Sequence, residues 1–481
     1  MHSTQLLIGG RWVDAGSGAT AETIDPATGD VIGVFADGDA VDVDAAVAAA
    51  RTGFESDAWQ SMSPDARGKV LWRVAELLEQ NAAEIAALET LDQGQPTSVS
   101  TNISLPLAAQ VFRYYAGFAT KLEGKVSPVS IPDQLSIQQR VPVGVVGLIT
   151  PWNFPLDIAA WKLAPALATG NAAILKPAEQ TPLTTVRLVE LCIEAGVPAG
   201  VVNLVTGGPV VGKALAAHPD VDLISFTGST AVGQEIVRVA ANDLKRVGLE
   251  LGGKAASIIC EDADLDAAVI GNLQGALFNT GQACGAFTRF FVHRSRADEF
   301  TSKLAAAADA LRIGRGLDPQ TVVGPLVSAE HLNRVHHYVE SGRAQGAELV
   351  TGGERVAGDL ANGFFYRPTV FAEVREDMTI AQEEIFGPVL SIMPYDDLDE
   401  AIARANGTPY GLVGVVWTQD LKKAHSIPPR LRAGTVFVNQ LPLIDPGSPW
   451  GGFGLSGWGR ELGAYSIDEF TETRTTFINL S

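Results

Sequence analysis

Cys284 is the cysteine whose surroundings suit covalent chemistry. It lies in the segment FNTGQACG, residues 278–285, where small side chains leave a thiol accessible. Cys192 lies instead among leucine and isoleucine in a helical pattern, which is typical of a buried apolar cysteine. A thiolate is a strong nucleophile. Because no sequence neighbour of Cys284 supplies a base or a positive charge, its structural and catalytic interpretations stay equally open on this segment alone.

A second group of chemically useful residues follows the ends of expected strands. Residues 150–155, 176–179 and 227–230 come directly after three apolar runs. In open parallel sheets, ligands bind beyond the carboxyl ends of the strands. Together the three segments supply an aromatic face, a cation, a carboxylate and a Gly/Ser helix start, which is what a dinucleotide requires.

Within this group, Gly228 and Ser229 begin a helix whose free amides and positive end suit a pyrophosphate. Gly233 completes a GxxxxG pattern, which by itself is more often an ordinary turn than a cofactor site. We expect Lys176 to hydrogen-bond ribose hydroxyls. Glu179 would accept from the 2′-hydroxyl of the adenosine ribose and repel a 2′-phosphate, so the sequence predicts NAD rather than NADP.

Seven short motifs follow one another in a fixed order along nearly the whole chain. They are PWNFP at 151–155, KPAE at 176–179, FTGST at 226–230, ELGGK at 250–254, GQAC at 281–284, EEIFGP at 383–388 and GRELG at 459–463. One such motif would be weak evidence, but the ordered set is very hard to obtain by chance. With these motifs the sequence resembles the aldehyde dehydrogenase superfamily.

The resemblance implies a role for each of three residues. The Cys284 thiolate adds to the aldehyde carbon, and the side-chain amide of Asn153 together with the Cys284 backbone amide holds the resulting oxyanion. Hydride loss to the nicotinamide leaves a thioester. Glu250 then deprotonates the water that hydrolyses it, which requires a carboxyl group whose pKa is raised by burial.

The resemblance also implies cofactor contacts and a proton relay. Glu384 would hold the nicotinamide ribose beside Phe386, although the adjacent Glu383 means that one of the two acids is simply solvated. Lys162 and Glu472 match positions of a relay from the general base, although Lys162 could merely extend from its helix to solvent. The expected cofactor-binding residues are Thr150, Pro151, Trp152, Lys176, Glu179, Gly228, Ser229, Gly233, Leu251, Gly252, Glu384 and Phe386.

The substrate pocket is expected on the helix that follows Asn153. Phe154, Ile158 and Trp161 recur at i, i+4 and i+7, and so share one helical face. Asp157 has two open interpretations, a tunnel acid that favours amino- or hydroxyaldehydes and an acid that stabilises the helix start. Two further pocket residues are expected where the family pattern is altered. They are Phe287, where a small residue is common, and Phe453, beside a glycine that replaces the usual lysine of GGxKxSG.

These side chains must be positioned by alternating strands and helices. Strands are expected at 144–149, 172–175, 201–205 and 223–226, with helices near 157–168, 184–195, 210–217 and 231–241, and an earlier helix from Ser63 to Thr90. The predicted fold is α/β, with a Rossmann-like doubly wound parallel sheet for NAD, a second α/β catalytic domain and a small β oligomerisation element. By analogy with the family, the expected domains are 1–119 with 143–253, then 254–466, and 120–142 with 467–481.

Composition limits the partners, location and metal sites that can be expected of the chain. The 481 residues carry a net charge of -20, which disfavours nucleic acid and anionic membranes as partners. Residues 1–14 contain no secretory signal pattern, so a cytoplasmic enzyme is expected. Three cysteines without CxxC spacing and seven histidines without an HExxH array predict no metal site. The expected partners are a small aldehyde and further copies of the chain, as a homodimer or homotetramer.

Two alternative functions remain to be weighed. A CoA-acylating dehydrogenase would share the fold, but a general base at Glu250 would compete for its thioester, so Glu250 favours hydrolysis. A structural or binding protein on an inactive scaffold would not need Cys284, Glu250 and Asn153 together. NADH formation from NAD and an aldehyde separates these classes.

Overall fold

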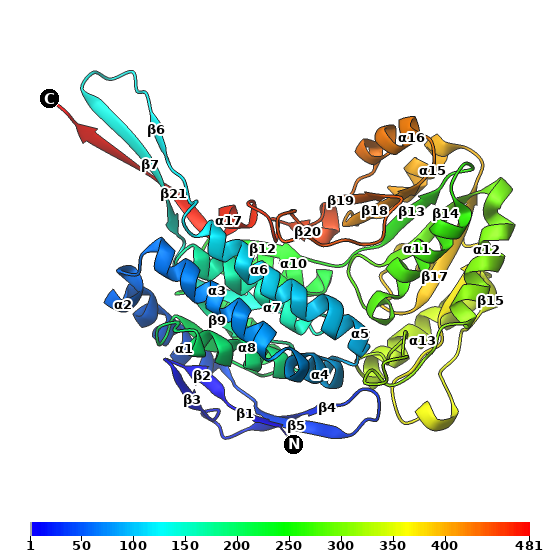
Figure 1. Cartoon of the computed structure of the whole chain (residues 1–481), viewed down its shortest axis with the longest axis horizontal. Helices are drawn as coiled ribbons and strands as arrows, with labels where there is room; N and C mark the ends of the chain where they lie inside the picture. The colour runs from blue at the N-terminus through cyan, green and yellow to red at the C-terminus, as the bar shows by residue number, and fades with distance from the viewer. Residues whose placement is uncertain (1) are drawn as a thin grey trace.

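The structure is a computed structural model that describes residues 2–481. In this range two large α/β sheets lie side by side, and a narrow three-stranded arm projects from one of them (Figure 1). None of its helices is long and apolar enough to cross a membrane. The α/β class with parallel sheets is confirmed.

The first sheet has the strand order β20-β12-β11-β8-β9-β10-β2-β3 within the described residues. Its five central strands are parallel and almost entirely buried, as expected of strands covered on both faces. They are β8 (Val145–Ile149), β9 (Ala172–Lys176), β10 (Val202–Leu204), β11 (Leu223–Thr227) and β12 (Arg246–Glu250). The edges are antiparallel and consist of β2 (Leu6–Ile8), β3 (Arg11–Val13) and β20 (Gly457–Trp458).

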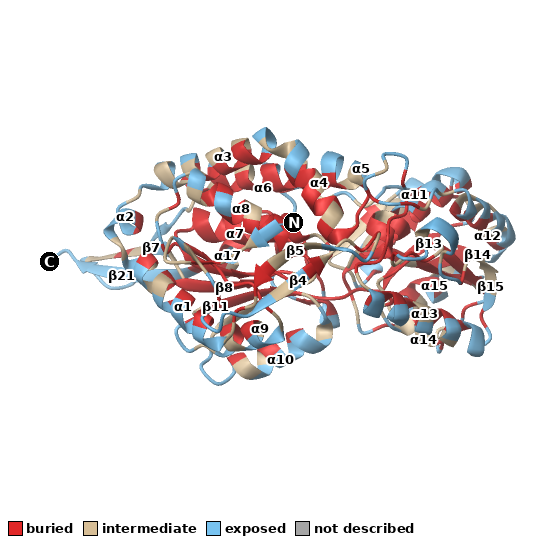
Figure 2. Cartoon of the chain, turned by 90° about the horizontal axis from the view of Figure 1, so that it is seen from below, coloured by how far each residue is buried: buried red, intermediate tan, exposed pale blue. Residues whose placement is uncertain are grey.

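Helices cover both faces of this sheet (Figure 2). One face carries α1 (Ala40–Glu55), α9 (Pro209–Ala217) and α10 (Thr230–Ala240). The other carries α3 (Pro64–Gln80), α4 (Ala82–Gln93), α6 (Leu105–Phe118), α7 (Pro155–Ala168) and α8 (Leu183–Glu194). The four strands and four helices expected between residues 144 and 241 are therefore confirmed to within about two residues at each end.

The single helix expected from Ser63 to Thr90 is two helices. Ser63 caps α3 as expected, and its side chain accepts from the amide of Ala66. The chain leaves the helical conformation at Asn81, with φ of -103° and ψ of 19°, and the Asn81 side chain donates to the carbonyl of Leu77. An asparagine that bonds the preceding turn in this way ends a helix even where the apolar pattern continues.

The second sheet has the order β15-β16-β17-β14-β13-β18-β19 among the described residues, and only β15 runs antiparallel. Its strands are β13 (Ala255–Ile259), β14 (Phe287–His293), β15 (Glu348–Thr351), β16 (Thr369–Ala372), β17 (Val389–Tyr395), β18 (Val413–Trp417) and β19 (Thr435–Val438). Helices α11 (Leu265–Leu277) and α12 (Arg294–Asp309) cover one face, and α13 (Ala329–Ala344) and α15 (Leu398–Ala405) the other (Figure 2).

The projecting arm joins distant parts of the chain. Strands β6 (Lys125–Ser127) and β7 (Gln134–Pro142) form a hairpin, and β21 (Thr471–Asn479) pairs antiparallel along the whole of β7. The tail strand β21 is thus an edge strand of the arm, with β7 as its neighbour. A further small sheet, β1 (His2–Thr4), β5 (Val31–Ala36) and β4 (Thr20–Ile24), lies beside the first large sheet (Figure 1).

Candidate active site

A cavity of about 290 Å³ lies where the carboxyl ends of the first sheet face the second sheet's loops. Its wall includes Cys284, Glu250 and Asn153, which lie in three separate segments of the sequence. Parallel strands place their carboxyl ends along one edge, so the segments after β8, β11 and β12 meet there. Residues separated in sequence are thus collected into one chemically useful wall.

The Asn153 and Cys284 loops are fixed to each other by hydrogen bonds. The side chain of Asn279 donates to the carbonyl of Asn153 at 2.8 Å, and the side chain of Asn153 donates to the carbonyl of Gln282 at 3.0 Å. Asn279 and Thr280 both have positive φ, 48° and 60°, an uncommon conformation in non-glycine residues that the surrounding contacts must hold. These contacts orient the Asn153 amide toward the segment that carries the thiol.

Cys284 is the partly exposed cysteine, whereas Cys192 and Cys260 are buried. Its enclosure, then the charges of Glu250 and Glu384, raise the pKa of the Cys284 thiol, while the backbone amide of Gly285 lowers it. Glu250 lines the same cavity, so its charge disfavours the thiolate that it faces.

Glu250 is the last residue of β12 and is 3% exposed. Burial first, then the charge of Glu461, raises the pKa of this carboxyl well above its usual range. Its Oε1 atom has no hydrogen-bond partner in residues 2–481. A buried carboxylate with a free oxygen is suited to accept a proton from water.

The cofactor side of the cavity matches most of the expected residues. Eight of those residues line it, together with Gln180, Thr227, Val327, Ser328, Glu330, His331 and Arg334, which the sequence interpretation missed. The eight are Pro151, Trp152, Gly228, Ser229, Leu251, Gly252, Glu384 and Phe386. No local motif marks the missed residues of α13 and the loop before it, because the fold alone brings them to the first sheet.

Trp152 is held by two rings from the second sheet's side. Its ring meets those of Phe386 and His331 edge-on, with centroids 5.2 and 5.1 Å apart. His331 Nε2 lies 2.7 Å from the carbonyl oxygen of Phe386, and burial lowers the pKa of His331 to about 4. The imidazole is therefore neutral at pH 7 and donates to this carbonyl. This hydrogen bond holds His331 and Phe386 in place beside Trp152.

Glu384 is fixed by the backbone it faces. Its carboxylate accepts from the amide of Gly253 at 2.8 Å, and a Cβ atom on Gly252 would lie 2.3 Å from Glu384 Oε2. Position 252 therefore requires glycine. Burial raises the pKa of Glu384 to about 7, while the Gly253 hydrogen bond and the charge of Lys254 lower it.

The other four expected cofactor residues lie behind or beside the wall, outside the lining formed by the described chain. Thr150 is buried, and Gly233 packs α10 against Leu251, where a Cβ atom would meet a methyl group at 2.6 Å. Lys176 and Glu179 form an ion pair, with Nζ 3.4 Å from Oε2, next to the lining residue Gln180.

Lys162 has a different partner from the one expected. Its ammonium group is 1% exposed, pairs with Glu461 and donates to the Ser225 hydroxyl at 3.0 Å. Glu472 lies on β21 with a side chain 58% exposed and pairs with Arg246. The ion-pair partner of Lys162 is therefore Glu461 and not Glu472, which corrects the expected pairing. The signal was present in the GRELG motif, whose glutamate is Glu461.

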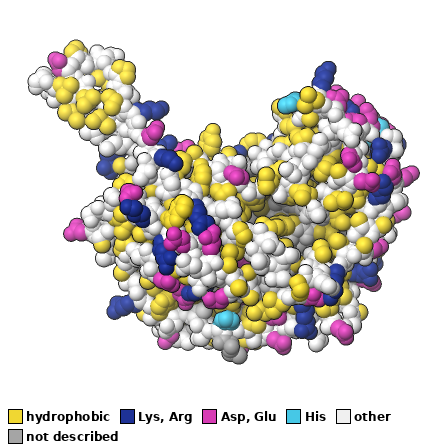
Figure 3. Space-filling model, in the orientation of Figure 1, with side chains coloured by type: hydrophobic (Ala, Val, Ile, Leu, Met, Phe, Trp, Pro, Cys, Tyr) yellow, Lys and Arg dark blue, Asp and Glu magenta, His cyan; other side chains and the backbone are white. Residues whose placement is uncertain are grey.

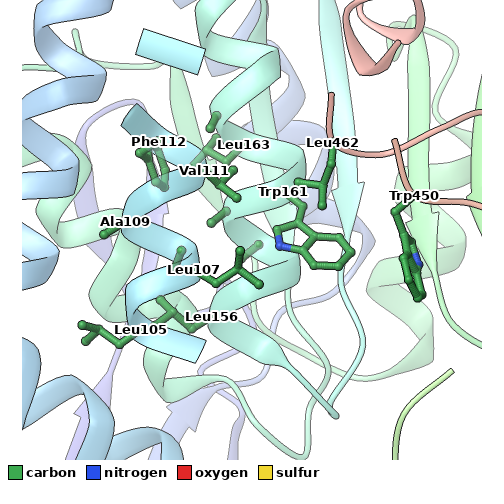
Figure 4. Close-up of a cluster of buried hydrophobic side chains, with 14 of the residues drawn as sticks. Leu105, Leu107, Ala109, Val111, Phe112, Leu156, Trp161, Leu163, Trp450 and Leu462 are labelled. Carbon is green, nitrogen blue, oxygen red and sulfur yellow. The ribbon is translucent and has the colours of Figure 1, made fainter. Parts of the chain in front are cut away.

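The expected substrate residues separate into two groups. Ile158 and Trp161 are buried on α7, Phe154 stacks on Phe278 with centroids 5.4 Å apart, and Trp161 lies 6.4 Å from Trp450 (Figure 4). These aromatic rings lie around the Cys284 segment, which packs against the same core cluster.

The remaining three expected substrate residues lie elsewhere. Phe287 is fully buried in the second domain's core against Phe437, so its placement in the pocket is corrected. Phe453 is 43% exposed with Arg460 over its ring.

Asp157 is 3% exposed, and burial, then the charge of Glu89, raises its pKa. It is therefore a buried acid in the first turn of α7, beside Glu89.

Comparisons with known proteins agree with this geometry. A family model for aldehyde dehydrogenases matches residues 12–476. The phenylacetaldehyde dehydrogenase of Pseudomonas fluorescens is 45% identical, covering 98% of this chain and 95% of that protein, and the betaine aldehyde dehydrogenase of Bacillus subtilis is 44% identical, covering 99% and 98%. The NAD+ complex of an aldehyde dehydrogenase from Bacillus cereus superposes with a TM-score of 0.98 at 44% identity, covering 100% of this chain and 97% of that one.

The family model spans nearly the whole chain, the relatives align from end to end, and the cavity holds a thiol, a buried carboxylate and an amide in one wall. The chain belongs to the aldehyde dehydrogenase family.

Proposed function

We propose that the chain oxidises an aldehyde to a carboxylic acid with NAD, through a thioester on Cys284 that water activated by Glu250 hydrolyses. The observation that carries this proposal is that one cavity wall contains Cys284, Glu250 and Asn153 together with the expected cofactor residues.

The first half of the reaction uses the thiol and two amides. The Cys284 thiolate, whose proton has already passed to water in the cavity, bonds to the aldehyde carbon. The negative charge that develops on the aldehyde oxygen is stabilised by the Asn153 side-chain amide and the Cys284 backbone amide. Asn153 is pre-oriented by its bond to Gln282, so little reorganisation is needed at this step.

The second half uses Glu250. A water molecule gives a proton to Glu250 while its oxygen bonds to the thioester carbon, and the carbon–sulfur bond then breaks to release the acid. The raised pKa of Glu250 makes its carboxylate a stronger base than an exposed glutamate. Hydrolysis regenerates the Cys284 thiolate.

The cavity fits a dinucleotide. Trp152 and Phe386 provide an apolar wall, Ser229 begins α10 with its free amides, and Glu384 presents a fixed carboxylate. A bound nicotinamide would supply the acceptor for the hydride lost from the carbon attached to sulfur. The Lys176–Glu179 pair beside Gln180 would contact the adenosine ribose, and the Glu179 carboxylate would disfavour the 2′-phosphate of NADP.

The substrate side is apolar and aromatic. Phe154, Ile158 and Trp161 are its expected residues on α7, with Trp450 facing Trp161 (Figure 4). Two relatives of almost equal identity are named for chemically different aldehydes, phenylacetaldehyde and betaine aldehyde. Overall identity therefore does not select the aldehyde, and the proposal stays at the level of a small-molecule aldehyde.

The arm supports assembly into a homodimer or homotetramer. Exposed apolar side chains gather on it, as Figure 3 shows at the projecting end, including Val126, Ile131, Phe477 and Leu480. Such a surface on a projecting sheet is typical of an interface between subunits. In this proposal residues 120–142 and 467–481 are the oligomerisation element, residues 1–119 and 143–253 bind NAD, and residues 254–466 are catalytic.

Strand β20 is an exception to this division. It lies within residues 254–466, but it pairs with β12 of the first sheet.

Mixing the protein with NAD and a panel of aldehydes, and following NADH absorbance, tests the function. Steady NADH formation without CoA supports hydrolytic release. A strong dependence on added CoA would favour the acylating alternative, and no NADH with any aldehyde class would refute the proposal.

A further inference from the structure

A row of buried polar groups runs from Glu250 along one face of the first sheet. Ser225 of β11 is paired with Gly248 of β12, and Thr227 is paired with Glu250. Side chains two residues apart on a strand point to the same face. All four positions therefore share the face covered by α7, opposite the apolar face formed with α9 and α10.

Contacts connect Lys162, Ser225, Thr227 and Glu461, and the charge of Glu461 acts on Glu250. Lys162 reaches down from α7 to the Ser225 hydroxyl at 3.0 Å and to the Glu461 carboxylate. The Thr227 hydroxyl lies 3.5 Å from Glu461 Oε1. In residues 2–481, Glu461 Oε2 has no hydrogen-bond partner, which leaves it free to exchange a proton.

Glu469 continues the row away from the cavity. A Cβ atom on Gly248 would lie 1.9 Å from Glu469 Oε1, so the carboxyl group fills the space that any side chain at position 248 would need. Ser225 is the register partner of Gly248, and its hydroxyl lowers the pKa of the same carboxyl group. Ser225 thus lies between Lys162 and Glu469.

Exposure distinguishes Glu469 from the rest of the row. Lys162, Ser225, Glu250 and Glu461 are 1%, 2%, 3% and 7% exposed, whereas Glu469 is partly exposed. The row therefore begins at the catalytic cavity and comes nearest to the molecular surface at Glu469, whose Oε1 is itself buried against Gly248. A second route to solvent matters because substrate and cofactor fill the cavity during turnover and block the direct route for a proton.

We propose that Glu469 is the outlet through which the proton collected by Glu250 reaches solvent. This rests on the proposed function, in which Glu250 takes one proton from water at each thioester hydrolysis. The proton passes from Glu250 to Glu461, then through the Lys162–Ser225 contacts to Glu469, and from there to water. Each group accepts a proton on one side and releases one on the other, so Glu250 returns to the carboxylate and nothing is oxidised or reduced.

The electrostatic setting suits this task. Burial raises the pKa of Glu469 to about 7, with Lys162 lowering it, Glu461 raising it and Arg246 lowering it. Tyr115 of α6 also faces this group, and its own pKa is raised partly by the charges of Glu461 and Glu469. A group whose pKa lies near the working pH transfers protons most effectively in both directions.

Glu469→Gln tests the outlet because glutamine keeps the shape but cannot ionise. NADH is followed in a rapid burst and in the steady state. We expect a full burst of one NADH per site, since acylation does not need the outlet, and a steady-state rate about tenfold lower. Asp468→Asn is the matched control, because Asp468 adjoins Glu469 but is exposed and pairs with Arg140. It should keep the rate of the unmodified chain.

Glu469→Ala with added imidazole separates proton transfer from a structural role. Imidazole has a pKa near neutrality and can replace a missing proton carrier in the space left by the side chain. We expect its addition to raise the steady-state rate in a saturable way and to leave the burst unchanged.

An unchanged rate in Glu469→Gln, a loss without imidazole rescue, or a lost burst in both variants would each overturn the outlet. A failure of the proposed function is distinguishable from these outcomes, because the unmodified chain would then form no NADH.

Discussion

Glu250→Gln separates the two halves of the proposed reaction. Glu250 is buried at 3% exposure, and glutamine has the same shape, so the fold should be kept. The variant loses the base for thioester hydrolysis. General-base catalysis contributes about 10²- to 10⁴-fold, so the steady-state rate should fall by this factor, equivalent to about 3 to 5 kcal/mol in the barrier.

The first turnover should respond in the opposite direction. The charge of Glu250 is the largest electrostatic cause of the raised pKa of Cys284, after burial. Removing that charge lowers the pKa of the thiol, and each unit of pKa changes the thiolate fraction by about tenfold where the thiol is mostly protonated. The variant should therefore form its first NADH at least as fast as the unmodified chain near pH 7.

The assay is rapid mixing of enzyme and NAD with an aldehyde, with NADH measured against active-site concentration. The expected trace is a burst of one NADH per site followed by a nearly flat phase. A steady-state rate equal to that of the unmodified chain would remove Glu250 as the base. A missing burst in a folded variant would show that Glu250 acts before hydride transfer, and the division of roles would be wrong.

Four further predictions address the other parts of the molecule. Cys284→Ala should abolish NADH formation while NAD still binds by calorimetry, whereas Cys192→Ala should keep the rate; turnover without the Cys284 thiol would refute the thioester route. The ratio of kcat/KM for NAD over NADP should be at least about tenfold, about 1.4 kcal/mol, and Glu179→Gln should reduce it; equal use of both cofactors would contradict the role of Glu179. Burial raises the pKa of Glu89 to about 8 from 4.5, so the folded state binds more protons between these values and the free energy of unfolding falls as pH rises, by about 1.4 kcal/mol per pH unit. The free energy of unfolding of Glu89→Gln, measured in urea, should therefore rise relative to that of the unmodified chain as pH increases. If the difference between the two free energies does not change with pH, Glu89 is not the cause. Asp157→Leu tests the acid of α7: a shift of kcat/KM from aminoaldehydes to aliphatic aldehydes would place Asp157 in the specificity pocket, and an unchanged ranking would leave it as a buried acid beside Glu89.

The sequence by itself determined the chemistry-bearing segments and the order of elements around them. Buried parallel strands are continuous apolar runs, so β8, β9, β10 and β11 could be located from local composition. The residues after them were then identifiable as the ligand edge. Asn153 and Glu250 are the clearest cases, since each lies at or just beyond a strand end and within a short motif.

Side-chain partners depended on the tertiary structure. Lys162 was expected beside Glu472, but its partner is Glu461, because β20 and the segment after it return to the first sheet and place Glu461 under α7. Phe287 was expected in the pocket because of its nearness to Cys284 in sequence. It is the first residue of β14, and its side chain points into the core against Phe437.

Which side chains are buried also depended on the tertiary structure. Nothing in the local sequence distinguishes the solvated Asp468 from its neighbour Glu469, whose carboxyl group occupies the space left by Gly248 on a strand more than 200 residues earlier. A pKa follows from desolvation and from charges that approach in space. Local sequence therefore fixes which groups can ionise and where the strands end, while only the packing of α7, β12 and the C-terminal segment decides which of those groups exchange protons.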